Sequence, residues 1–319
     1  MRNGRSSGLL TQRYLLDDMS SEDADPLTPK SGRNGRPRKA HPEFDGSLLY
    51  EYPTHLRQSI EDLPALPGVY TFHGEEGDLP LYIGKSINIR SRVLSHLRNP
   101  DEARLLRQTR RISCERTAGE IGALLLEARL IKTLLPLHNQ RLRRSRQLFA
   151  WRMQKTQLEL VNAKDAKFGL EVGLYGLYAS RHAAQDQLRA LADAQGLCYG
   201  VLGLEKVATA RPCFRAQLQQ CLGACCGRES IEAHQRRLAE ALQSLHVACW
   251  PYAGAVALIE RQDSLEDLHV VQNWCYLGTA KTLDEAKTLG AVHASFDADS
   301  YKILCKPILQ GSLEIVALS

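Results

Sequence analysis

The sequence predicts an α+β fold, with a small antiparallel sheet flanked by helices, then a cysteine-rich segment and a smaller mixed α/β C-terminal region. Three observations support this prediction. A β-hairpin pattern occupies residues 67–84, two stretches of helically spaced apolar residues follow before residue 136, and five of the nine cysteines lie within residues 198–226. With 319 residues and 44% hydrophobic content, the chain can form two modest domains with ordinary packed cores.

The hairpin contains the first two expected strands. PGVYTFHG, residues 67–74, is typical of a strand that starts after Pro-Gly, and EEGD has the composition of a turn. LYIG, residues 81–84, would be the returning strand. Tyr70 and Tyr82 are therefore expected on paired strands.

A helix, a third strand and a second helix are expected next. Apolar residues recur every four positions up to Leu97 and predict the first helix, and RRISCERT, residues 110–117, has the composition of a strand. Thr117 and Glu120 have the spacing of a capping box, in which two side chains satisfy the first amides of a helix. This second helix is expected to end before Pro136.

Composition divides the chain into five parts. Residues 1–46 are rich in Ser, Gly, Asn, Asp, Pro and Arg and show no periodicity, so we expect a disordered leader. The α+β unit is expected over residues 47–145, and a basic connector without a clear period over residues 146–197. The cysteine-rich segment covers residues 198–227, and the C-terminal α/β region covers residues 228–319.

The C-terminal region combines one predicted helix with several predicted strands. ESIEAHQRRLAEALQSLHV, residues 229–247, has a helical pattern. Strand-like alternation occurs in AVALIE, HVVQNWCYLG, YKILCKPIL and LEIVAL. We find no internal repeat in the chain.

Positive charge is concentrated in one part of the sequence. Residues 85–155 contain 17 Lys and Arg against 5 Asp and Glu, a net charge of +12, which leaves −7 for the rest of a chain whose total is +5. A solvated charged face would mix both signs. A one-sided, arginine-rich accumulation of this size instead favours a polyanion such as nucleic acid.

The sequence indicates a protein of the cytosol. No stretch approaches 18 uncharged apolar residues, and the N-terminus has no apolar run of signal-peptide length. An odd number of cysteines in a reducing compartment does not favour a disulfide framework. The nine cysteines are therefore expected to serve as thiols, metal ligands or cluster ligands.

One constellation of residues is more specific than the charge pattern. Gly68-Val69-Tyr70 and Tyr82-Ile83-Gly84-Lys85 are followed by Arg92, by Glu127 within a helical pattern, and by Asn139. This set resembles the GIY-YIG endonuclease family. PGVY, LYIGKS, ALLLEARLIK and PLHNQRL are similar to the UvrC-like excinucleases, and the resemblance to the shorter Cho group of that family extends over roughly residues 47–319.

Glu127 is a candidate metal ligand on independent grounds. Its helical neighbours three and four positions away are all apolar, so no basic residue there can form an ordinary surface ion pair with it: they are Ala123, Leu124, Leu130 and Ile131. The alternative is a solvated carboxylate at the edge of an apolar stripe. A lone carboxylate beside an apolar face is a suitable hard ligand for Mg²⁺ or Mn²⁺, which usually need only one or two protein carboxylates in addition to water and phosphate.

The resemblance also implies roles for the other members of the set. Tyr82 would be the general base or orient the attacking water, helped by the charge of Lys85, which would lower the pKa of its phenol. Tyr70 would act beside it through hydrogen bonds. Arg92 would bind the scissile phosphate through its planar fork, and Asn139 would hold the site or the phosphate in register.

Other basic residues are expected to follow the DNA backbone. Arg90 lies two residues from Arg92, on a different helical face, so we assign it to phosphate binding and not to catalysis. The remaining residues expected to contact DNA are Arg98, Arg141, Arg143, Arg144 and Arg146.

The cysteine-rich segment is a second candidate site. Cys213, Cys221 and Cys225 follow a C-x7-C-x3-C spacing, with Cys198 upstream, and Cys226 could replace Cys225 after a small shift in register. The resemblance implies a [4Fe–4S] cluster on these four thiolates. Zinc and free structural thiols are the alternatives. The isolated cysteines are expected to pack as small apolar residues: these are Cys114, Cys249, Cys275 and Cys305.

Three functions from different classes follow. The resemblance implies an endonuclease that cuts damaged double-stranded DNA once, on the 3′ side of a lesion, after the UvrA and UvrB proteins have marked it. UvrB would dock within residues 228–319. A GIY-YIG nuclease of another kind would not need the cysteine segment. A non-enzymatic, cluster-bearing DNA-binding regulator would carry a degraded nuclease site, whereas every residue of the set is present.

Overall fold

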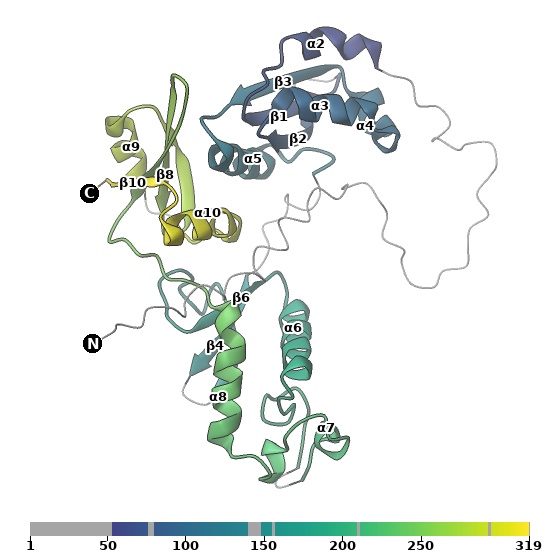
Figure 1. Ribbon diagram of the computed structural model, residues 1–319, viewed down its shortest axis with the longest axis vertical. Helices are drawn as coiled ribbons and strands as arrows, with labels where there is room; N and C mark the ends of the chain where they lie inside the picture. Colours follow the sequence, from purple (N-terminus) through teal and green to yellow (C-terminus); the bar gives the residue numbers. More distant parts are fainter. Residues whose placement is uncertain are drawn as a thin grey trace, which may run out of the picture. The chain divides into compact units, whose positions relative to one another are not determined.

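The structure is a computed structural model that describes residues 53–75, 80–139, 148–154, 157–208, 211–292 and 295–318. The chain forms two compact units, which we describe separately (Figure 1). One unit joins the N-terminal α+β region to residues 252–319, and the other contains residues 146–251. The predicted leader, residues 1–46, lies outside the described residues.

A three-stranded antiparallel sheet forms the centre of the N-terminal region. Its strands are β1 (Gly68–His73), β2 (Pro80–Ser86) and β3 (Arg111–Arg116), in the order β2-β1-β3. The predicted hairpin and third strand are thus confirmed. In the register of β1 and β2, Tyr70 lies opposite Gly84 and Phe72 lies opposite Tyr82.

Helices cover both faces of this sheet because its apolar residues alternate between the faces. Tyr70 and Phe72 pack with the short helices and α3 on one side, while Val69 and Ile83 pack against Ile131 of α5 on the other. The helices concerned are α2 (Arg57–Glu61), α3 (Ile89–Arg98), α4 (Ala103–Gln108) and α5 (Glu120–Leu134), with 3₁₀ turns η2 (Thr54–Leu56) and η3 (Pro100–Glu102). The predicted α+β architecture, with helices flanking a small sheet, is confirmed.

The predicted capping box at the start of α5 is wrong. The residue before the helix is Gly119, and no side chain of this segment caps it. Thr117 instead donates its hydroxyl to the carbonyl of Gly119, at 2.8 Å. Glu120 is the first helical residue, so its side chain is not placed to return to the helix start as a capping box requires.

The unit of residues 146–251 has its own sheet and helices. Strands β4 (Phe149–Gln154), β5 (Gln157–Asn162) and β6 (Leu174–Tyr178) have the order β5-β4-β6. Figure 1 shows α6 (Arg181–Ala194) and α8 (Ile231–Leu242) running side by side. Trp151, Leu188 and Leu238 share one core cluster that joins β4 to both helices. The smaller elements are α7 (Phe214–Gln217), η4 (Ala224–Cys226) and η5 (Gln243–Leu245).

The expected connector over residues 146–197 is not what the structure shows, since its described part contains three strands and α6. The first three residues of β4 are all buried, so the central strand lacks the alternation that sequence analysis looks for. The predicted helix over residues 229–247 is found as α8 and η5, with Ser230 capping α8 through the amide of Ala233. It belongs to this unit and not to the C-terminal region.

The C-terminal region contains a four-stranded antiparallel sheet in the order β10-β7-β8-β9. Its strands are β7 (Val256–Gln262), β8 (Leu265–Gln272), β9 (Cys275–Ala280) and β10 (Glu314–Ala317), and its helices are α9 (Leu283–Gly290) and α10 (Ala298–Gln310). Ile259 and Leu268 pack with Ala286 of α9 on one face. Along β7 and β8 the alternate residues, including Glu260 and His269, point to the opposite face.

Of the strands predicted for this region, one is wrong and another is wrong in part. YKILCKPIL lies within α10, where Tyr301, Leu304 and Ile308 are buried at helical spacing despite Pro307 inside the helix. HVVQNWCYLG is divided by a turn between β8 and β9. AVALIE overlaps most of β7, and LEIVAL contains β10, as expected. Within the described ranges, no helix is both long and apolar enough to cross a membrane.

The turn between β8 and β9 leads to a prediction about stability. Trp274 has a positive φ of 62° there, is fully buried, and packs edge-on against Tyr301 with ring centroids 5.0 Å apart. We expect Trp274→Ala to lower the free energy of unfolding of this unit by about 3–5 kcal/mol. Urea denaturation followed by circular dichroism measures this. Asp263→Gly is the matched control, because Asp263 has a similar φ of 54° in an exposed turn. Equal stability of both variants would contradict the prediction.

Candidate active site

The two tyrosines of the hairpin lie together at the centre of the first sheet. Tyr70 is 1% exposed, and its ring centroid lies 6.3 Å from that of the half-buried Tyr82. Gly84 faces Tyr70 across the strands, and a Cβ atom placed on it would lie only 2.4 Å from the Tyr70 hydroxyl oxygen. Glycine at this position therefore makes room for the phenol of Tyr70.

Sequence reasoning missed two residues that extend this pair. The hydroxyl of Tyr70 lies 2.7 Å from Nε2 of His96, and Nδ1 of the same ring bonds to the carboxylate of Glu102. All three side chains are buried. A carboxylate oxygen accepts hydrogen bonds, so Nδ1 donates to Glu102 and Nε2 is left to accept from the hydroxyl of Tyr70. The available signal was the position of His96 one helical turn after Arg92.

Arg92 faces the tyrosines from α3. It hydrogen-bonds the side chain of Tyr70, and its charge lowers the pKa of Tyr70 and Tyr82. Burial has the larger effect, and the nearby carboxylate of Glu127 adds to it. The pKa of Tyr82 is raised to about 12, and that of Tyr70 also lies well above its usual value. Both phenols are therefore protonated at neutral pH.

The pKa of Tyr82 is raised and not lowered as expected, because burial has the largest effect on it and the charge of Glu127 acts in the same direction. Nζ of Lys85 lies 3.2 Å from a carboxylate oxygen of Glu120, the first residue of α5. This ion pair directs the ammonium group towards the start of the helix.

Glu127 lies on α5 about two turns after Glu120, on the same face of the helix. Its Oε1 accepts a hydrogen bond from the backbone amide of Lys85, at 3.0 Å. The residue is half-buried, and its charge raises the pKa of both tyrosines, which places it close to them. Sheet and helix thus bring the predicted metal ligand next to the predicted base.

Asn139 holds the strand that carries Tyr82 and Lys85. Its Oδ1 accepts from the amide of Ile83 at 2.9 Å, and its Nδ2 donates to the carbonyl of Ile83 at 2.8 Å. The backbone next to Asn139 also bonds to β2, because the amide of His138 donates to the carbonyl of Leu81 at 2.8 Å. Both polar ends of the Asn139 amide are therefore used to fix β2.

The basic residues divide by burial. Arg92 is half-buried, whereas Arg90 and Arg98 are exposed, which agrees with the different helical faces inferred for Arg90 and Arg92. Four further arginines predicted to contact DNA lie outside the described residues: Arg141, Arg143, Arg144 and Arg146.

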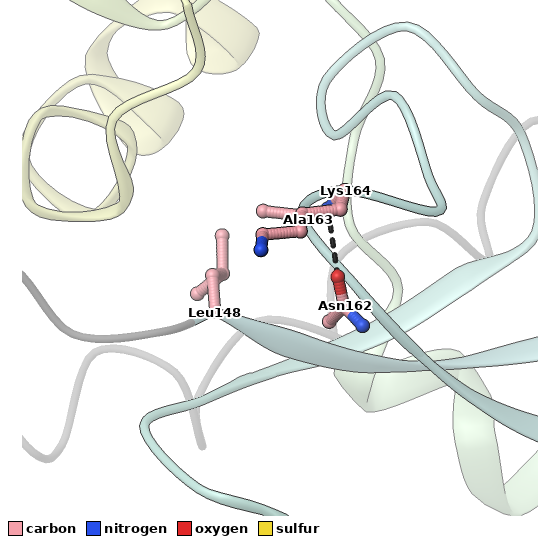
Figure 2. A pocket seen from close by; sticks show the side chains of 4 residues that line it. All are labelled: Leu148, Asn162, Ala163 and Lys164. Atoms are coloured by element: carbon pink, nitrogen blue, oxygen red, sulfur yellow. Dashed lines mark hydrogen bonds between the residues drawn. The ribbon is translucent and has the colours of Figure 1, made fainter.

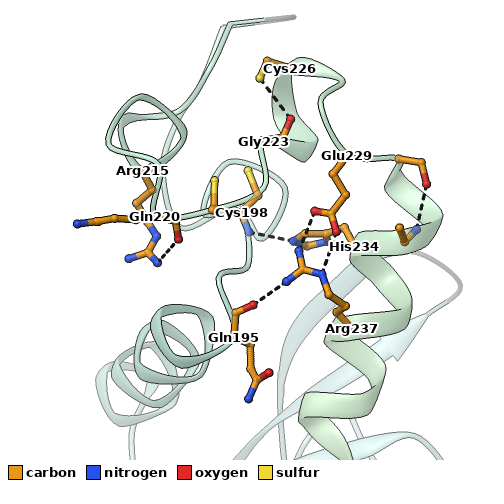
Figure 3. Close-up of polar contacts among 12 residues, drawn as sticks. Gln195, Cys198, Arg215, Gln220, Gly223, Cys226, Glu229, His234 and Arg237 are labelled. Carbon is orange, nitrogen blue, oxygen red and sulfur yellow. Dashed lines mark hydrogen bonds and ion pairs between the residues drawn. The ribbon is translucent and has the colours of Figure 1, made fainter.

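The cysteine-rich segment gathers the four predicted thiols in the other unit. Sγ of Cys213 lies 3.7 Å from Sγ of both Cys198 and Cys221. The sulfur of Cys225 accepts from the amide of Cys213 at 3.2 Å, and with Cys198 and Cys213 it forms a group whose sulfurs all lie within 4.8 Å of one another. Cys226 donates to the carbonyl of Gly223 (Figure 3). The geometry therefore favours Cys225 over Cys226 as the fourth member.

The thiols influence one another's ionisation. Burial raises the pKa of Cys221 to about 11 and that of Cys225 to about 12. Burial acts in the same direction on Cys213, but hydrogen bonds from the Ala216 amide and the neighbouring thiols outweigh it and lower the pKa of Cys213. A cation bound among them would have to displace the protons of the other thiols.

Helix α8 supports the loop that carries Cys198. Nε2 of His234 accepts from the amide of Cys198 at 3.0 Å. One turn later, Arg237 donates to the carbonyl of Gln195 and forms a bidentate pair with Glu229, with N···O distances of 2.9 and 2.7 Å (Figure 3). The first cysteine of the group is thus fixed by a buried helix face.

A surface depression in the same unit carries no comparable set of side chains. Leu148, Asn162, Ala163 and Lys164 line it, and the amide of Lys164 donates to Oδ1 of Asn162 at 2.8 Å (Figure 2). None of the predicted catalytic or thiol residues belongs to it. We assign it no function.

Comparison with protein families divides the chain into three matched segments. Residues 66–140 match a model described as the UvrC-like GIY-YIG domain. Residues 148–244 match the UvrC/Cho excinuclease middle domain, and residues 255–319 match the excinuclease Cho C-terminal domain.

Similar proteins cover most of the chain. Excinuclease Cho of Escherichia coli K12 is 56% identical over 276 residues, which are 86% of this chain and 94% of that protein. The excinuclease Cho of Salmonella typhimurium is 55% identical over the same shares. A crystal structure of the magnesium-bound GIY-YIG domain of UvrC from Thermotoga maritima is 32% identical, covers 26% of this chain and 93% of that chain, and has a TM-score of 0.24.

The contact between Gly84 and Tyr70 generates a prediction for this site. Gly84→Ala forces the phenol of Tyr70 away, so we expect nicking of supercoiled plasmid to fall by about 10²-fold, as is usual when a reacting group moves by about 1 Å. Affinity for DNA should change little, because the substitution alters no basic residue. Gly74→Ala is the control, since a Cβ atom there meets only Leu81 at ordinary contact distance. Full nicking by Gly84→Ala would show that the position of Tyr70 is not critical.

Proposed function

The chain belongs to the UvrC/Cho excinuclease family, and we propose that it cuts damaged double-stranded DNA on the 3′ side of a lesion, at sites prepared by UvrA and UvrB. It is a GIY-YIG endonuclease of excision repair. The observation that carries the proposal is the convergence of Tyr82, Arg92 and Glu127 beside one strand, with Glu127 bonded to that strand through the amide of Lys85.

The tyrosines would move a proton from the attacking water. With its pKa raised to about 12, Tyr82 is a neutral phenol and can accept a proton only as it releases its own. Tyr82 is hydrogen-bonded to Tyr70, and Tyr70 bonds to His96, whose other nitrogen bonds to Glu102. Through these hydrogen bonds the proton released by Tyr82 would pass to Tyr70 and on to His96.

Arg92 would bind the scissile phosphate. It is half-buried beside the tyrosines, so its charge is screened less by water than that of an exposed arginine. Its planar group can donate two parallel hydrogen bonds to phosphate oxygens and so hold the phosphorus in line with the attacking water. Arg90 and Arg98, which are exposed, would bind neighbouring phosphates.

Glu127 fits the requirement for a divalent metal. It supplies a hard oxygen ligand beside an apolar helix face, and Mg²⁺ or Mn²⁺ commonly uses one protein carboxylate together with water and substrate phosphate. When bound, such an ion supplies charge neutralisation for the departing 3′ oxygen. The protein's own contribution is the bond between Glu127 and the amide of Lys85, which fixes the carboxylate.

UvrB docking is proposed for residues 228–319. Within this range, α9 and α10 present exposed apolar side chains, Leu283 at 48% and Leu309 at 45% exposure, which suit a protein contact better than a DNA contact. The distribution of charge agrees, because the strongly basic part of the chain is residues 85–155.

Incision of a duplex with a single lesion tests the proposal. With UvrA, UvrB and Mg²⁺ or Mn²⁺ present, we expect one cut on the 3′ side, and little cutting when UvrB is omitted. Glu127→Gln should reduce the rate by about 10³-fold with nearly unchanged DNA affinity, because no basic residue is lost. Glu115→Gln, which removes an exposed carboxylate on β3, is the matched control.

Other outcomes of this assay identify the alternatives. Efficient cutting of undamaged or branched DNA without UvrB would indicate a GIY-YIG nuclease of another kind. Tight DNA binding without any cut by wild-type protein would indicate a non-enzymatic regulator. Wild-type rates in Glu127→Gln would remove this residue from the site.

We further propose that the four thiols hold a [4Fe–4S] cluster. Cys198, Cys213, Cys221 and Cys225 form one largely buried group, and four thiolates are the usual ligands of such a cluster. Zinc is a second candidate, because sulfurs 3.7 Å apart match the edge of a tetrahedron with metal–sulfur bonds of about 2.3 Å. A cluster of four irons would require the sulfurs to lie further apart.

Elemental analysis separates the two candidates. Protein purified without oxygen should be brown and hold about four irons and four sulfides per chain. Cys225→Ser should lose colour and iron, whereas Cys226→Ser should keep both, because Cys226 bonds to Gly223 instead of joining the group. A colourless protein with one zinc would exclude the cluster and leave the nuclease proposal unaffected.

A further inference from the structure

The amino end of α5 is capped by a residue from the C-terminal sheet. The first amides of a helix have no partner within the helix, and Gly119 has no side chain to supply one. Glu260 of β7 supplies it. Its Oε1 accepts from the amide of Ile121 at 3.2 Å, and its Oε2 accepts from the amide of Gly122 at 2.7 Å.

Two glycines allow this close approach. A Cβ atom on Gly119 would lie 2.2 Å from Oε1 of Glu260, and one on Gly122 would lie 2.7 Å from Cε1 of His269. Gly119 has extended backbone angles that any residue adopts (φ −167°, ψ −172°), so space and not conformation excludes a side chain there. Glycine at both positions therefore leaves the space that the carboxylate of Glu260 and the ring of His269 occupy.

The carboxylate of Glu260 is itself held in place. Nε2 of His269 lies 3.0 Å from its Oε2, and Nδ1 of that ring lies 2.9 Å from the hydroxyl of Thr279. Burial acts to raise the pKa of Glu260, but the hydrogen bonds from His269 and Gly122 outweigh it and lower the pKa. Next to it, Asp267 accepts from the amide of Ala118 at 2.7 Å.

The capped helix carries two groups of the active site. Glu120, its first residue, pairs with Lys85, and Glu127, seven residues later on the same face, bonds to the amide of Lys85. A shift or fraying of the first turn of α5 would therefore move the partner of Lys85 directly. It would also tilt the helix that presents Glu127.

We propose that Glu260 is a positioning residue of the nuclease, which fixes α5 so that Glu127 and Lys85 keep the geometry needed for metal binding and incision. The proposal rests on the function proposed above. It assigns the C-terminal domain a second task beside any partner binding, namely to complete the active site of the N-terminal domain within the same chain.

Substitution of Glu260 tests the proposal in full-length protein. We expect Glu260→Ala to reduce nicking by about 10²-fold, to raise the Mn²⁺ concentration for half-maximal nicking, and to leave DNA affinity unchanged. Glu260→Gln keeps the shape and one acceptor oxygen and should have an intermediate effect. Glu266→Gln is the control, because Glu266 lies exposed on β8 and bonds to Arg261.

A second-site change distinguishes capping from general damage to the fold. Gly119→Asp alone should impair nicking, because its side chain would collide with Glu260 and repel it. In the Glu260→Ala background the same aspartate occupies the vacated space as an ordinary helix cap, so the double variant should recover nicking at least 10-fold over Glu260→Ala. A double variant no better than Glu260→Ala would overturn the proposal.

Hydrogen exchange provides a readout that does not depend on nicking. The amides of Ile121 and Gly122 should exchange faster in Glu260→Ala and regain protection in the double variant, while Mn²⁺ binding should weaken and recover in parallel. If wild-type protein binds Mn²⁺ but cuts no DNA, the proposed function fails while these two measurements still decide the role of Glu260. Unchanged exchange and Mn²⁺ affinity in Glu260→Ala would refute that role.

Discussion

The structure of the nuclease unit depends on how α5 is held. Helix α5 presents Glu127, the proposed metal ligand, and three contacts restrain the helix from rotating or fraying. Glu260 satisfies its first amides, Glu127 bonds to the edge of the sheet, and near its other end Lys132 pairs with Asp297 and Asp299 of the C-terminal region, each at 2.7 Å. The buried cap is the strongest of these, since ionised groups bonded to amides away from water contribute about 1.5–3 kcal/mol, against less than about 1 kcal/mol for exposed ion pairs.

Strand β2 contacts most of the residues of the candidate active site. Four successive residues serve different neighbours: Tyr82 belongs to the tyrosine pair, Ile83 is held by Asn139, and Gly84 leaves room for Tyr70. The backbone of Lys85 binds Glu127. Because these contacts come from consecutive positions of one strand, the spacing between the side chain of Tyr82 and the amide of Lys85 follows from strand geometry. The position of the Glu127 carboxylate depends in addition on how α5 is held.

Sequence analysis predicted what depends on neighbours in the chain. The hairpin, β3 and α5 follow from local periodicity, and the set from Tyr70 to Asn139 follows from its motif. It could not predict the cap of α5, because Glu260 lies 138 residues after Gly122 and only the folded sheet brings them together. His96 was overlooked for a similar reason, since its partners Tyr70 and Glu102 become neighbours only after α3 packs on the sheet. In α10 the sequence pattern around Pro307 favoured a strand. Tertiary packing outweighs this local preference, and the segment forms a helix.

The middle unit is, in effect, an insertion within another folding unit, because residues 146–251 separate the two halves that share the cap of α5. During synthesis on the ribosome, the motif residues emerge long before β7 and β8 exist. The amino end of α5 therefore lacks its carboxylate until nearly the whole polypeptide has been made. An incomplete chain that stops in the middle unit therefore carries every motif residue of the nuclease but lacks the carboxylate that caps α5.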